Sequence, residues 1–204
     1  MSDKKYWNSF YKEKTYSAED THLSDPSSFA IFSKDFLCKD DRVLDVGCGN
    51  GRDSLYLKDY CQSLVGIDNS STSISFLKGY ETNNSNLSFV LCDVGDIHTL
   101  DNPTVVYTRF FLHSINLDQQ THLFTWLEKL DSNTKLMLEC RSDKDVGTRY
   151  FKDPHYRRLI NYDKLVEEVK NLGYSIDYSL ESTGLSPYKE EDPFLIRLRA
   201  TKND

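Results

Sequence analysis

The sequence predicts an α/β domain with a seven-stranded, mostly parallel sheet, helices on both of its faces and an antiparallel hairpin at its end. Short apolar runs typical of buried strands alternate along the chain with segments of helical periodicity. Such alternation favours a parallel sheet, because each parallel strand pair needs a crossover connection, usually a helix. The last two apolar runs follow one another without a helix between them, which indicates the reversed hairpin.

Each strand and helix can be assigned a range from this pattern. The expected strands are 42–46, 64–67, 87–92, 104–108, 135–140, 174–180 and 194–200. The helices among them are expected at 51–60, 70–80, 117–130 and 162–173. Gly173 closes the last of these, as glycine commonly does just beyond a helix C-terminus.

Two further helices are expected ahead of the first strand. The segment 24–36 predicts a helix that begins at Ser24 or Asp25, with Pro26 at its first position. The aromatic segment 6–11 predicts a short helix or flap. This flap can serve either as a lid over a ligand or as a staple onto the core.

Length and charge exclude several classes of protein. With 204 residues the chain suits one domain, 1–204, with a helical cap over 1–40 and a sheet core over 41–204. No apolar run approaches the roughly 20 residues of a membrane helix, so no membrane contact is expected. The first ten residues carry no apolar signal region. The net charge of −7 argues against nucleic acid as a partner.

The cysteines and histidines give no sign of a disulfide framework or a metal site. Five cysteines are present, and no two of them form a C-x-x-C pair, which favours a reducing, cytoplasmic location. Cys48, Cys92 and Cys140 lie in or beside expected strands, where a free thiol behaves as a small buried hydrophobe. The five histidines show no ligand spacing, and we expect no metal.

A glycine-rich segment, VLDVGCGNGRD at 43–53, is the sharpest motif in the chain. Gly47, Gly49 and Gly51 permit a tight turn with positive φ, let a ligand approach the backbone, and leave helix N–H groups free to bind it. Placed between a strand and a helix, this is a nucleotide-type site. The spacing differs from the dinucleotide pattern G-x-G-x-x-G, and Asp45 would repel a pyrophosphate. We therefore expect a cationic ligand here rather than NAD.

Two more acids stand where the next strands end. Asp68 follows Gly51 by 17 residues, near the spacing at which an acid binds a ribose diol. Asp93 ends the third strand and can accept a hydrogen bond from an adenine amino group. Together with the glycine loop, these acids indicate a nucleoside-containing ligand.

The segments VLDVGCGNG, IDNS and LCDVGDI resemble the first three motifs of the class I S-adenosylmethionine-dependent methyltransferases. The resemblance covers roughly residues 30–200 and implies a Rossmann-like fold, S-adenosylmethionine as cofactor and S-adenosylhomocysteine as product. In that family the glycine loop cradles the methionine part, the second acid binds ribose and the third flanks adenine. Carried over, the implied cofactor contacts are Tyr11, Asp45, Gly47, Cys48, Gly49, Asp68, Asn69, Asp93, Val94 and Arg109.

The exit of the fourth strand, TRFFLHSI at 108–115, lies where this family places residues nearest the transferred methyl group. Arg109 and His113 are its polar members and our catalytic candidates. His113 could act as a general base or contact an anion. The alternative is a solvent-facing histidine on a helix turn.

A basic segment follows the fifth strand. Residues 141–158 hold six Lys or Arg and three Asp in an otherwise acidic chain. Guanidinium groups match phosphate and carboxylate oxygens in pairs, so an anionic acceptor is indicated. The alternative is a solvated loop with local ion pairs. The candidate substrate-binding residues, including one from the loop between the last two strands, are Arg141, Tyr150, His155, Arg157, Arg158 and Tyr188.

The segments RFFLHSI, ECRSDKD and HYRRLI, with the tail STGLSPYKEEDPFLIRLRATK, resemble a bacterial subgroup of these methyltransferases associated with capsule, lipopolysaccharide and other surface glycans. This resemblance implies O-methylation of a small phosphorylated sugar or nucleotide-linked precursor. Three alternatives stay open: a methyltransferase for another metabolite such as a thiol, amine or carboxylate, an inactive cofactor-binding subunit of an active partner, and an RNA methyltransferase. The acidic charge and the lack of an RNA-binding appendage disfavour the last.

Overall fold

The computed structural model describes residues 4–15, 25–81, 85–145, 156–187 and 190–204. All seven expected strands are present and form one sheet of order β3-β2-β1-β4-β5-β7-β6. Their bounds are β1 (Arg42–Val46), β2 (Ser63–Asp68), β3 (Leu87–Leu91), β4 (Val105–Arg109), β5 (Lys135–Arg141), β6 (Tyr174–Ser182) and β7 (Leu195–Lys202). The predicted fold class is confirmed.

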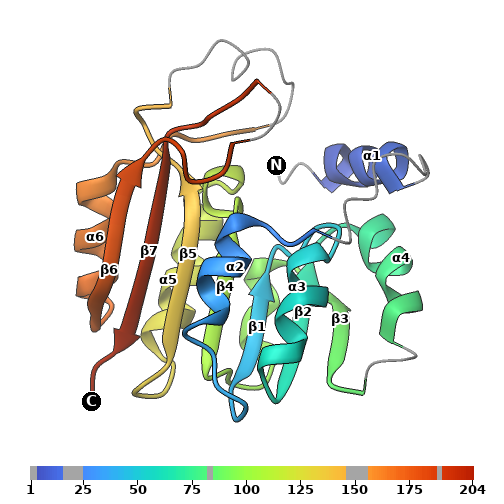
Figure 1. Cartoon of the computed structure of the whole chain (residues 1–204), viewed down its shortest axis with the longest axis horizontal. Helices are drawn as coiled ribbons and strands as arrows, with labels where there is room; N and C mark the ends of the chain where they lie inside the picture. Colours follow the sequence, from blue (N-terminus) through green and yellow to red (C-terminus); the bar gives the residue numbers. More distant parts are fainter. Residues whose placement is uncertain (1–3, 16–24, 82–84, 146–155, 188–189) are drawn as a thin grey trace.

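The direction of the last two strands decides what lies at the carboxyl edge of the sheet. Strands β1 to β5 run parallel, whereas β7 pairs antiparallel with both β5 and β6. Leu195 at the start of β7 is in register with Arg141 on one side and Ser182 on the other. The described parts of the connection 183–194, which are 183–187 and 190–194, therefore lie at the same edge as the carboxyl ends of β1 to β5 (Figure 1).

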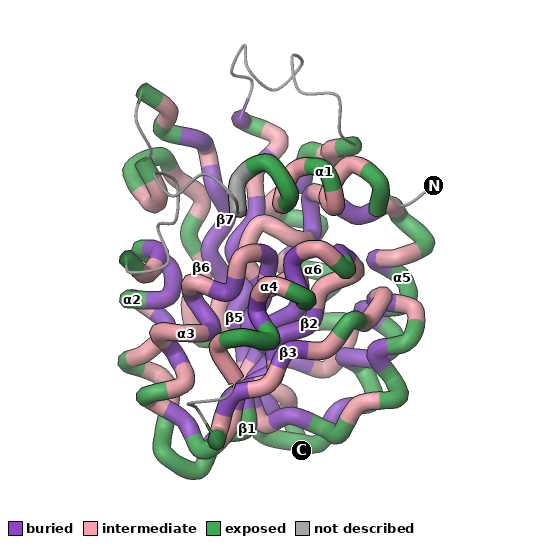
Figure 2. Tube along the Cα trace, turned by 90° about the vertical axis from the view of Figure 1, so that its right-hand side faces the viewer, coloured by how far each residue is buried: buried purple, intermediate pink, exposed green. Residues whose placement is uncertain are grey.

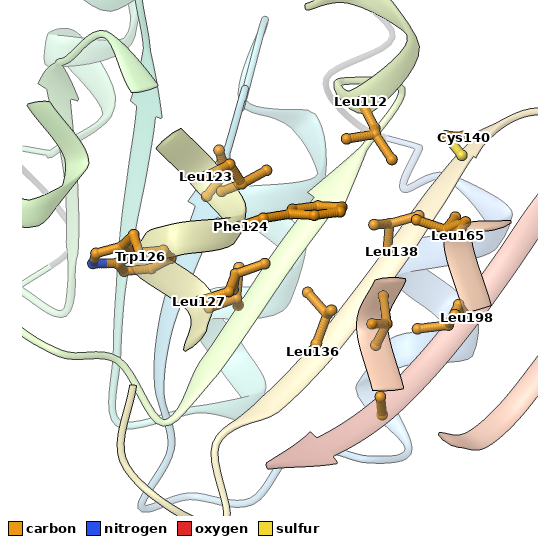
Figure 3. Packing of buried hydrophobic residues seen from close by; sticks show 14 of the residues in the cluster. Leu112, Leu123, Phe124, Trp126, Leu127, Leu136, Leu138, Cys140, Leu165 and Leu198 are labelled. Carbon is orange, nitrogen blue, oxygen red and sulfur yellow. The ribbon is translucent and has the colours of Figure 1, made fainter. Parts of the chain in front are cut away.

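The helices cover both faces of the sheet. One face packs against α2 (Ser28–Lys34), α3 (Arg52–Leu57) and α4 (Ser71–Glu81), and the other against α5 (Leu117–Glu128) and α6 (Tyr162–Asn171). Successive residues of each strand point to opposite faces of the sheet, so they contribute alternately to the hydrophobic cores on the two faces. On the second face Phe124 and Leu127 of α5 pack toward Leu136 and Leu138 of β5 (Figure 3). The strands are largely buried while exposed residues gather on turns and outer helix surfaces (Figure 2).

The predicted start of α2 was wrong. The helix begins at Ser28, with Ser27 as its N-cap in extended conformation (φ −66°, ψ 157°) and Pro26 one residue before the cap. The Ser27 hydroxyl accepts a hydrogen bond from the Ala30 N–H at 3.0 Å. Serine is a strong N-cap because its side chain satisfies an N–H group that the first helical turn leaves unpaired.

Other helix ends differ from expectation by smaller amounts. The helix expected at 51–60 divides into α3 and a 3₁₀ turn, η1 (Lys58–Tyr60), and α5 ends at Glu128 rather than at residue 130. Gly173 follows α6 with φ +83°, the left-handed position predicted for it. The short turns η2 (Val94–Thr99) and η3 (Leu112–Ser114) follow β3 and β4.

The aromatic segment near the N-terminus forms α1 (Lys4–Thr15), which lies beside α4 at the carboxyl edge (Figure 1). The side-chain oxygen of Asn8 accepts a hydrogen bond from the Ser70 hydroxyl at 2.8 Å and from the Thr72 N–H at 3.3 Å. Asn8 thereby satisfies donors at the start of α4 and fixes one helix against the other.

All five cysteines are free. Of the three expected to be buried, only Cys140 is; Cys48 and Cys92 are half-buried, because both face the cavity described below. Within the described ranges, no helix is both long and apolar enough to cross a bilayer.

Candidate active site

A cavity of about 700 Å³ opens at the carboxyl edge of the sheet, within the size range of small-molecule sites. It is bordered by the ends of β1, β2, β4 and β5, by α1 and by the connection 183–194. It brings together most of the site residues expected from the sequence: Tyr11, Asp45, Gly47, Cys48, Gly49, Asp68, Asn69, Val94, Arg109, His113, Arg141 and Arg157.

The glycine loop between β1 and α3 has no room for side chains. Gly47, Gly49 and Gly51 have φ values of +76°, +57° and +75°. A Cβ on Gly47 would lie 2.4 Å from a Phe111 ring carbon, and one on Gly49 would lie 2.6 Å from the Tyr11 hydroxyl oxygen. Only glycine satisfies both the positive φ and the close packing at these positions.

Asp68, at the end of β2, is held by the backbone around it. One carboxylate oxygen accepts from the Gly49 N–H at 3.1 Å and the other from the Ser70 N–H at 2.8 Å. Burial raises the pKa of this carboxyl above its usual value, although the two N–H donors favour the charged form. Asp68 thus orders the glycine loop and presents a carboxylate to the cavity.

Asp45 is 2% exposed and lies at the end of β1, beneath the same loop. One of its oxygens accepts a hydrogen bond from the Ser54 hydroxyl on α3. Burial, together with the neighbouring carboxylates of Asp53 and Asp68, raises the pKa of Asp45 to about 7 against the opposing effects of the Ser54 hydroxyl and the Arg109 guanidinium. A cation bound here would favour the ionised carboxylate.

Arg109, at the end of β4, has a fixed orientation. Its Nε donates to Glu139 Oε1 at 3.0 Å and its Nη2 donates to the Ser186 hydroxyl at 2.8 Å. The guanidinium stacks on the Phe110 ring, 4.1 Å from the ring centroid. Phe110 itself has φ +56°, a conformation that costs energy for a bulky residue and that concentrates at functional sites.

His113 is 3% exposed, so the solvent-facing alternative was wrong. Its Nδ1 accepts a hydrogen bond from the Arg141 backbone N–H at 3.2 Å. A neutral imidazole that accepts at Nδ1 carries its proton on Nε2. This tautomer makes Nε2 a donor, which suits contact with an anion better than removal of a proton.

The basic residues after β5 separate into different roles. The Arg141 guanidinium pairs with Asp145 at 2.6 Å, lies 3.7 Å from Glu191, and borders the cavity together with Arg157. Arg158 does not border it. Its guanidinium donates to the Ile115 carbonyl at 3.1 Å and the Leu112 carbonyl at 3.2 Å, and also to Gln120, so this side chain joins η3 to α5 instead of meeting a substrate.

Asp93 also has a different position from the one predicted. Its side chain caps η2 by accepting the Gly95 N–H at 3.2 Å, and its neighbours Cys92 and Val94 border the cavity in its place. A carboxylate that precedes a helical turn satisfies a free N–H group, and this local demand determines where it points. The candidates Tyr150, His155 and Tyr188 lie outside the described residues.

Sequence reasoning missed an acid that joins α2 to the cavity wall. Asp53 accepts hydrogen bonds from the Ser27 N–H at 2.8 Å, the Ser27 hydroxyl at 2.7 Å and the buried Tyr107 hydroxyl at 2.8 Å. It directly follows the glycine loop, a position that could have drawn attention to it. Phe110 and Ser186 were missed as well, and neither carried a signal of its own in the sequence.

These residues fit S-adenosylmethionine. The buried carboxylate of Asp45 and the half-buried carboxylate of Asp68 flank a glycine loop without side chains of its own, and this half of the cavity favours a ligand with cationic groups and hydroxyl donors. Asp68 would hold the ribose hydroxyls, the glycine loop and Asp45 the methionine part, and Asn69 and Val94 the adenine.

The raised pKa of Asp45 leads to an expected pH dependence of cofactor binding. A cationic ligand requires the ionised carboxylate, so below the free protein's pKa of about 7 a proton must leave before the ligand binds. S-adenosylmethionine should bind roughly tenfold more weakly at pH 6 than at pH 8. Calorimetry in buffers of different ionisation enthalpy should record proton release at pH 6. The Asp45→Asn variant controls for titration of the ligand itself, and an unchanged pH profile in that variant would refute the assignment.

Comparison with known proteins agrees with this geometry. Residues 43–130 match the model of a methyltransferase domain family. TehB from Haemophilus influenzae superposes with a TM-score of 0.74 at 17% identity, over 93% of this chain and 67% of that one. No match was found among curated proteins.

Two similar structures contain S-adenosylhomocysteine. A 1,6-didemethyltoxoflavin-N1-methyltransferase from Burkholderia thailandensis has a TM-score of 0.73 at 16% identity, over 100% of this chain and 88% of that one. The N-methyltransferase NodS from Bradyrhizobium japonicum WM9 has a TM-score of 0.72 at 14% identity, over 97% and 99%. Such likeness establishes the Rossmann-like fold, and the family match covers the cofactor half. Residues 43–130 of this chain thus match a methyltransferase domain family, and the whole chain shares its fold with methyltransferases whose structures contain S-adenosylhomocysteine.

Proposed function

We propose that the protein methylates an oxygen atom of a small anionic acceptor, such as a phosphorylated sugar or a nucleotide-linked precursor of a bacterial surface polysaccharide. The observation that carries the proposal is a separation of charge along the carboxyl edge of the sheet. Asp68 ends β2 and Asp45 is the next-to-last residue of the neighbouring strand β1, whereas Arg109 and Arg141 end the next two strands, β4 and β5. All four side chains belong to residues that border the cavity.

Arginines predominate on the basic half of the cavity, and two of them have carboxylate partners: Arg109 pairs with Glu139, and Arg141 pairs with Asp145. Arg109, Arg141 and Arg157 border this half, with Glu191 as the carboxylate from the connection 183–194. Burial and the nearby Arg109 guanidinium also lower the pKa of Arg52 at the middle of the cavity. An anionic acceptor would suit this arginine-rich wall, because guanidinium groups bind phosphate or carboxylate oxygens in pairs.

The protein's own groups would orient the acceptor and exclude water. When bound, S-adenosylmethionine supplies an already electrophilic methyl group. Arg141 and Arg157 would hold the anion, and His113 would donate from Nε2 to an acceptor oxygen. A phosphate or carboxylate oxygen needs no base, which agrees with a histidine whose Nδ1 is already engaged. The surface-glycan assignment rests on the resemblance of 109–115, 139–145 and 155–160 to that bacterial subgroup.

A carboxylate metabolite is the second candidate, because the same arginines would bind it equally well. An amine acceptor would be cationic before reaction and would meet repulsion from Arg109 and Arg141. Of the expected cap over 1–40, we propose that α1 covers the single domain, since Trp7, Phe10 and Tyr11 border the cofactor half of the cavity, whereas α2 is part of the sheet core.

Formation of S-adenosylhomocysteine with a panel of acceptors tests the proposal. The panel pairs each sugar phosphate and nucleotide sugar with its uncharged parent sugar, and adds carboxylates, thiols and amines. Turnover confined to the phosphorylated members supports the proposal, and turnover with carboxylates alone favours the second candidate. Turnover with uncharged or cationic acceptors contradicts it, and cofactor binding without any turnover favours the role of an inactive partner subunit.

Arg157→Ala should raise the KM of a phosphorylated acceptor about tenfold while S-adenosylhomocysteine affinity stays unchanged, because one charge-assisted contact to the anion is lost. Arg42→Ala is the matched control, since Arg42 is exposed at the opposite edge of the sheet. Initial-rate kinetics and calorimetry provide the two readouts. An unchanged KM in the Arg157 variant would remove this residue from the acceptor site.

A further inference from the structure

A single buried carboxylate lies between two arginines beneath the acceptor half of the cavity. Glu139 is 1% exposed and stands on β5 in direct register with Arg109 of β4 and Arg197 of β7. Its Oε1 accepts from Arg109 Nε at 3.0 Å, and its Oε2 accepts from Arg197 Nε at 2.9 Å. The three side chains form a charged row across three adjacent strands.

Arg109 and Arg197 each use Nη2 to bind the connection 183–194. Arg197 Nη2 donates to the Leu185 carbonyl at 3.1 Å, and Arg109 Nη2 donates to the Ser186 hydroxyl at 2.8 Å. Two consecutive residues of this connection are therefore fixed by the two arginines that share Glu139. Ser186 and its neighbour Pro187 border the cavity, so the row sets the position of one cavity wall.

One edge of the Arg109 guanidinium remains for a ligand. Its Nε and Nη2 have protein partners, and one face is stacked on Phe110. Among the described residues, none provides an acceptor for Nη1, and Nη1 is not among the buried nitrogens without a partner. Since Arg109 borders the cavity, Nη1 is open to it.

The charges of this row also indicate that Arg109 is the residue that contacts a ligand. Arg109 and Arg197 share the Glu139 carboxylate, and water screens the charges of this buried row poorly. Arg197 is 6% exposed and donates from Nε and Nη2 to Glu139, Ser28 and Leu185, whereas Arg109 borders the cavity, so Arg109 is the member of the row that a ligand can reach. An acceptor anion would complete the row.

We infer that Glu139 is a positioning residue for the acceptor. It fixes Arg109 so that Nη1 meets an oxygen of the acceptor's anionic group, and through Arg197 it holds the 183–194 wall at the same place. This inference rests on the proposed function and adds the means by which the acceptor's charge is recognised. A merely structural role would hold β4, β5 and β7 together without any effect that depends on acceptor charge.

The test compares Glu139→Gln with Asp41→Asn. Asp41 is 4% exposed and pairs with Lys135 at 2.8 Å, so it is also a buried acid paired to β5, but at the opposite edge of the sheet. Binding of α-D-glucose 1-phosphate and of glucose to protein saturated with S-adenosylhomocysteine is measured by calorimetry. Glu139→Gln should weaken phosphate-sugar binding about 10- to 100-fold, since the charged hydrogen bonds that orient Arg109 are lost. S-adenosylhomocysteine affinity and weak glucose binding should not change, and Asp41→Asn should bind both sugars like the wild type.

The possible results distinguish a failure of the Glu139 positioning role from a failure of the proposed function. If the wild type does not prefer glucose 1-phosphate to glucose, the proposed phosphate recognition fails and the inference fails with it. If the wild type shows the preference and Glu139→Gln retains it, only the positioning role is overturned. Should Glu139→Gln not fold, Ser186→Ala and Arg109→Lys decide: both should weaken phosphate-sugar binding, the first about threefold to tenfold and the second at least tenfold. Wild-type binding in both variants would refute the inference.

Discussion

Replacing Asp68 by alanine is expected to weaken S-adenosylhomocysteine binding by at least about 100-fold, because charge-assisted hydrogen bonds to the ribose hydroxyls are lost in a buried site. The loss has a second component. Asp68 also accepts the Gly49 N–H at 3.1 Å and the Ser70 N–H at 2.8 Å, so its removal releases the glycine loop that should cradle the methionine part. Calorimetric titration of the product into the variant measures both components together.

Two variants separate the contributions. Asp68→Asn keeps a hydrogen-bond acceptor for the loop but loses the charge, and its affinity should fall between those of the wild type and Asp68→Ala. Asp96→Ala removes an exposed acid from the nearby turn η2 and should bind like the wild type. If a folded Asp68→Ala protein binds the product with wild-type affinity, Asp68 is not the ribose ligand.

Gly51→Ala is expected to lower the free energy of unfolding by about 3 kcal/mol, from left-handed strain and overpacking together. Gly51 has φ +75° and ends the loop at the start of α3. A Cβ there would lie 2.5 Å from a Leu77 methyl carbon and 3.3 Å from the Phe89 ring, both of which are fully buried. Urea unfolding of wild type and variant gives the difference.

Alanine substitutions at two other glycines separate backbone strain from overpacking as causes of the lower stability. Gly184 has φ +76° with open space around it, so Gly184→Ala carries only the left-handed strain, about 1–2 kcal/mol. Gly79 lies within α4, also with open space, and Gly79→Ala should stabilise the protein by up to about 1 kcal/mol. If Gly51→Ala lowers the free energy of unfolding no more than Gly184→Ala does, the Leu77 and Phe89 side chains can move to accommodate the new methyl group without loss of stability.

The sequence predicted strands and helix ends well where their formation depends on a few residues that are close together in the chain. Strands were found from short apolar runs, and Gly173 was placed correctly beyond α6 because a left-handed residue is needed there. The start of α2 was missed because Pro26 and Ser27 both suit a helix start, and the choice was settled by Asp53, which lies 26 residues away and anchors Ser27.

The role of a single polar residue is likewise not determined by its neighbours in the sequence. Asp93 and Arg158 have the residue types that a ligand would require, yet one caps η2 and the other bonds carbonyls of η3 and its surroundings. A polar side chain bonds whichever unpaired groups the fold brings near, since leaving a buried donor or acceptor unpaired is costly. Residue type alone cannot say which groups those are.

By itself, the sequence determined the strands, the glycine loop and the positions of Asp45 and Asp68 beside it, because each depends on residues that are close together along one strand–turn–helix unit. Only the tertiary structure decided the acceptor half. The row formed by Arg109, Glu139 and Arg197 depends on the register of three strands that are far apart in the chain. Its link to Ser186 depends on the reversal of β7, which brings 183–194 to the carboxyl edge. The charge recognition that we propose would therefore depend on strand pairing, and strand pairing is set by packing of the whole sheet.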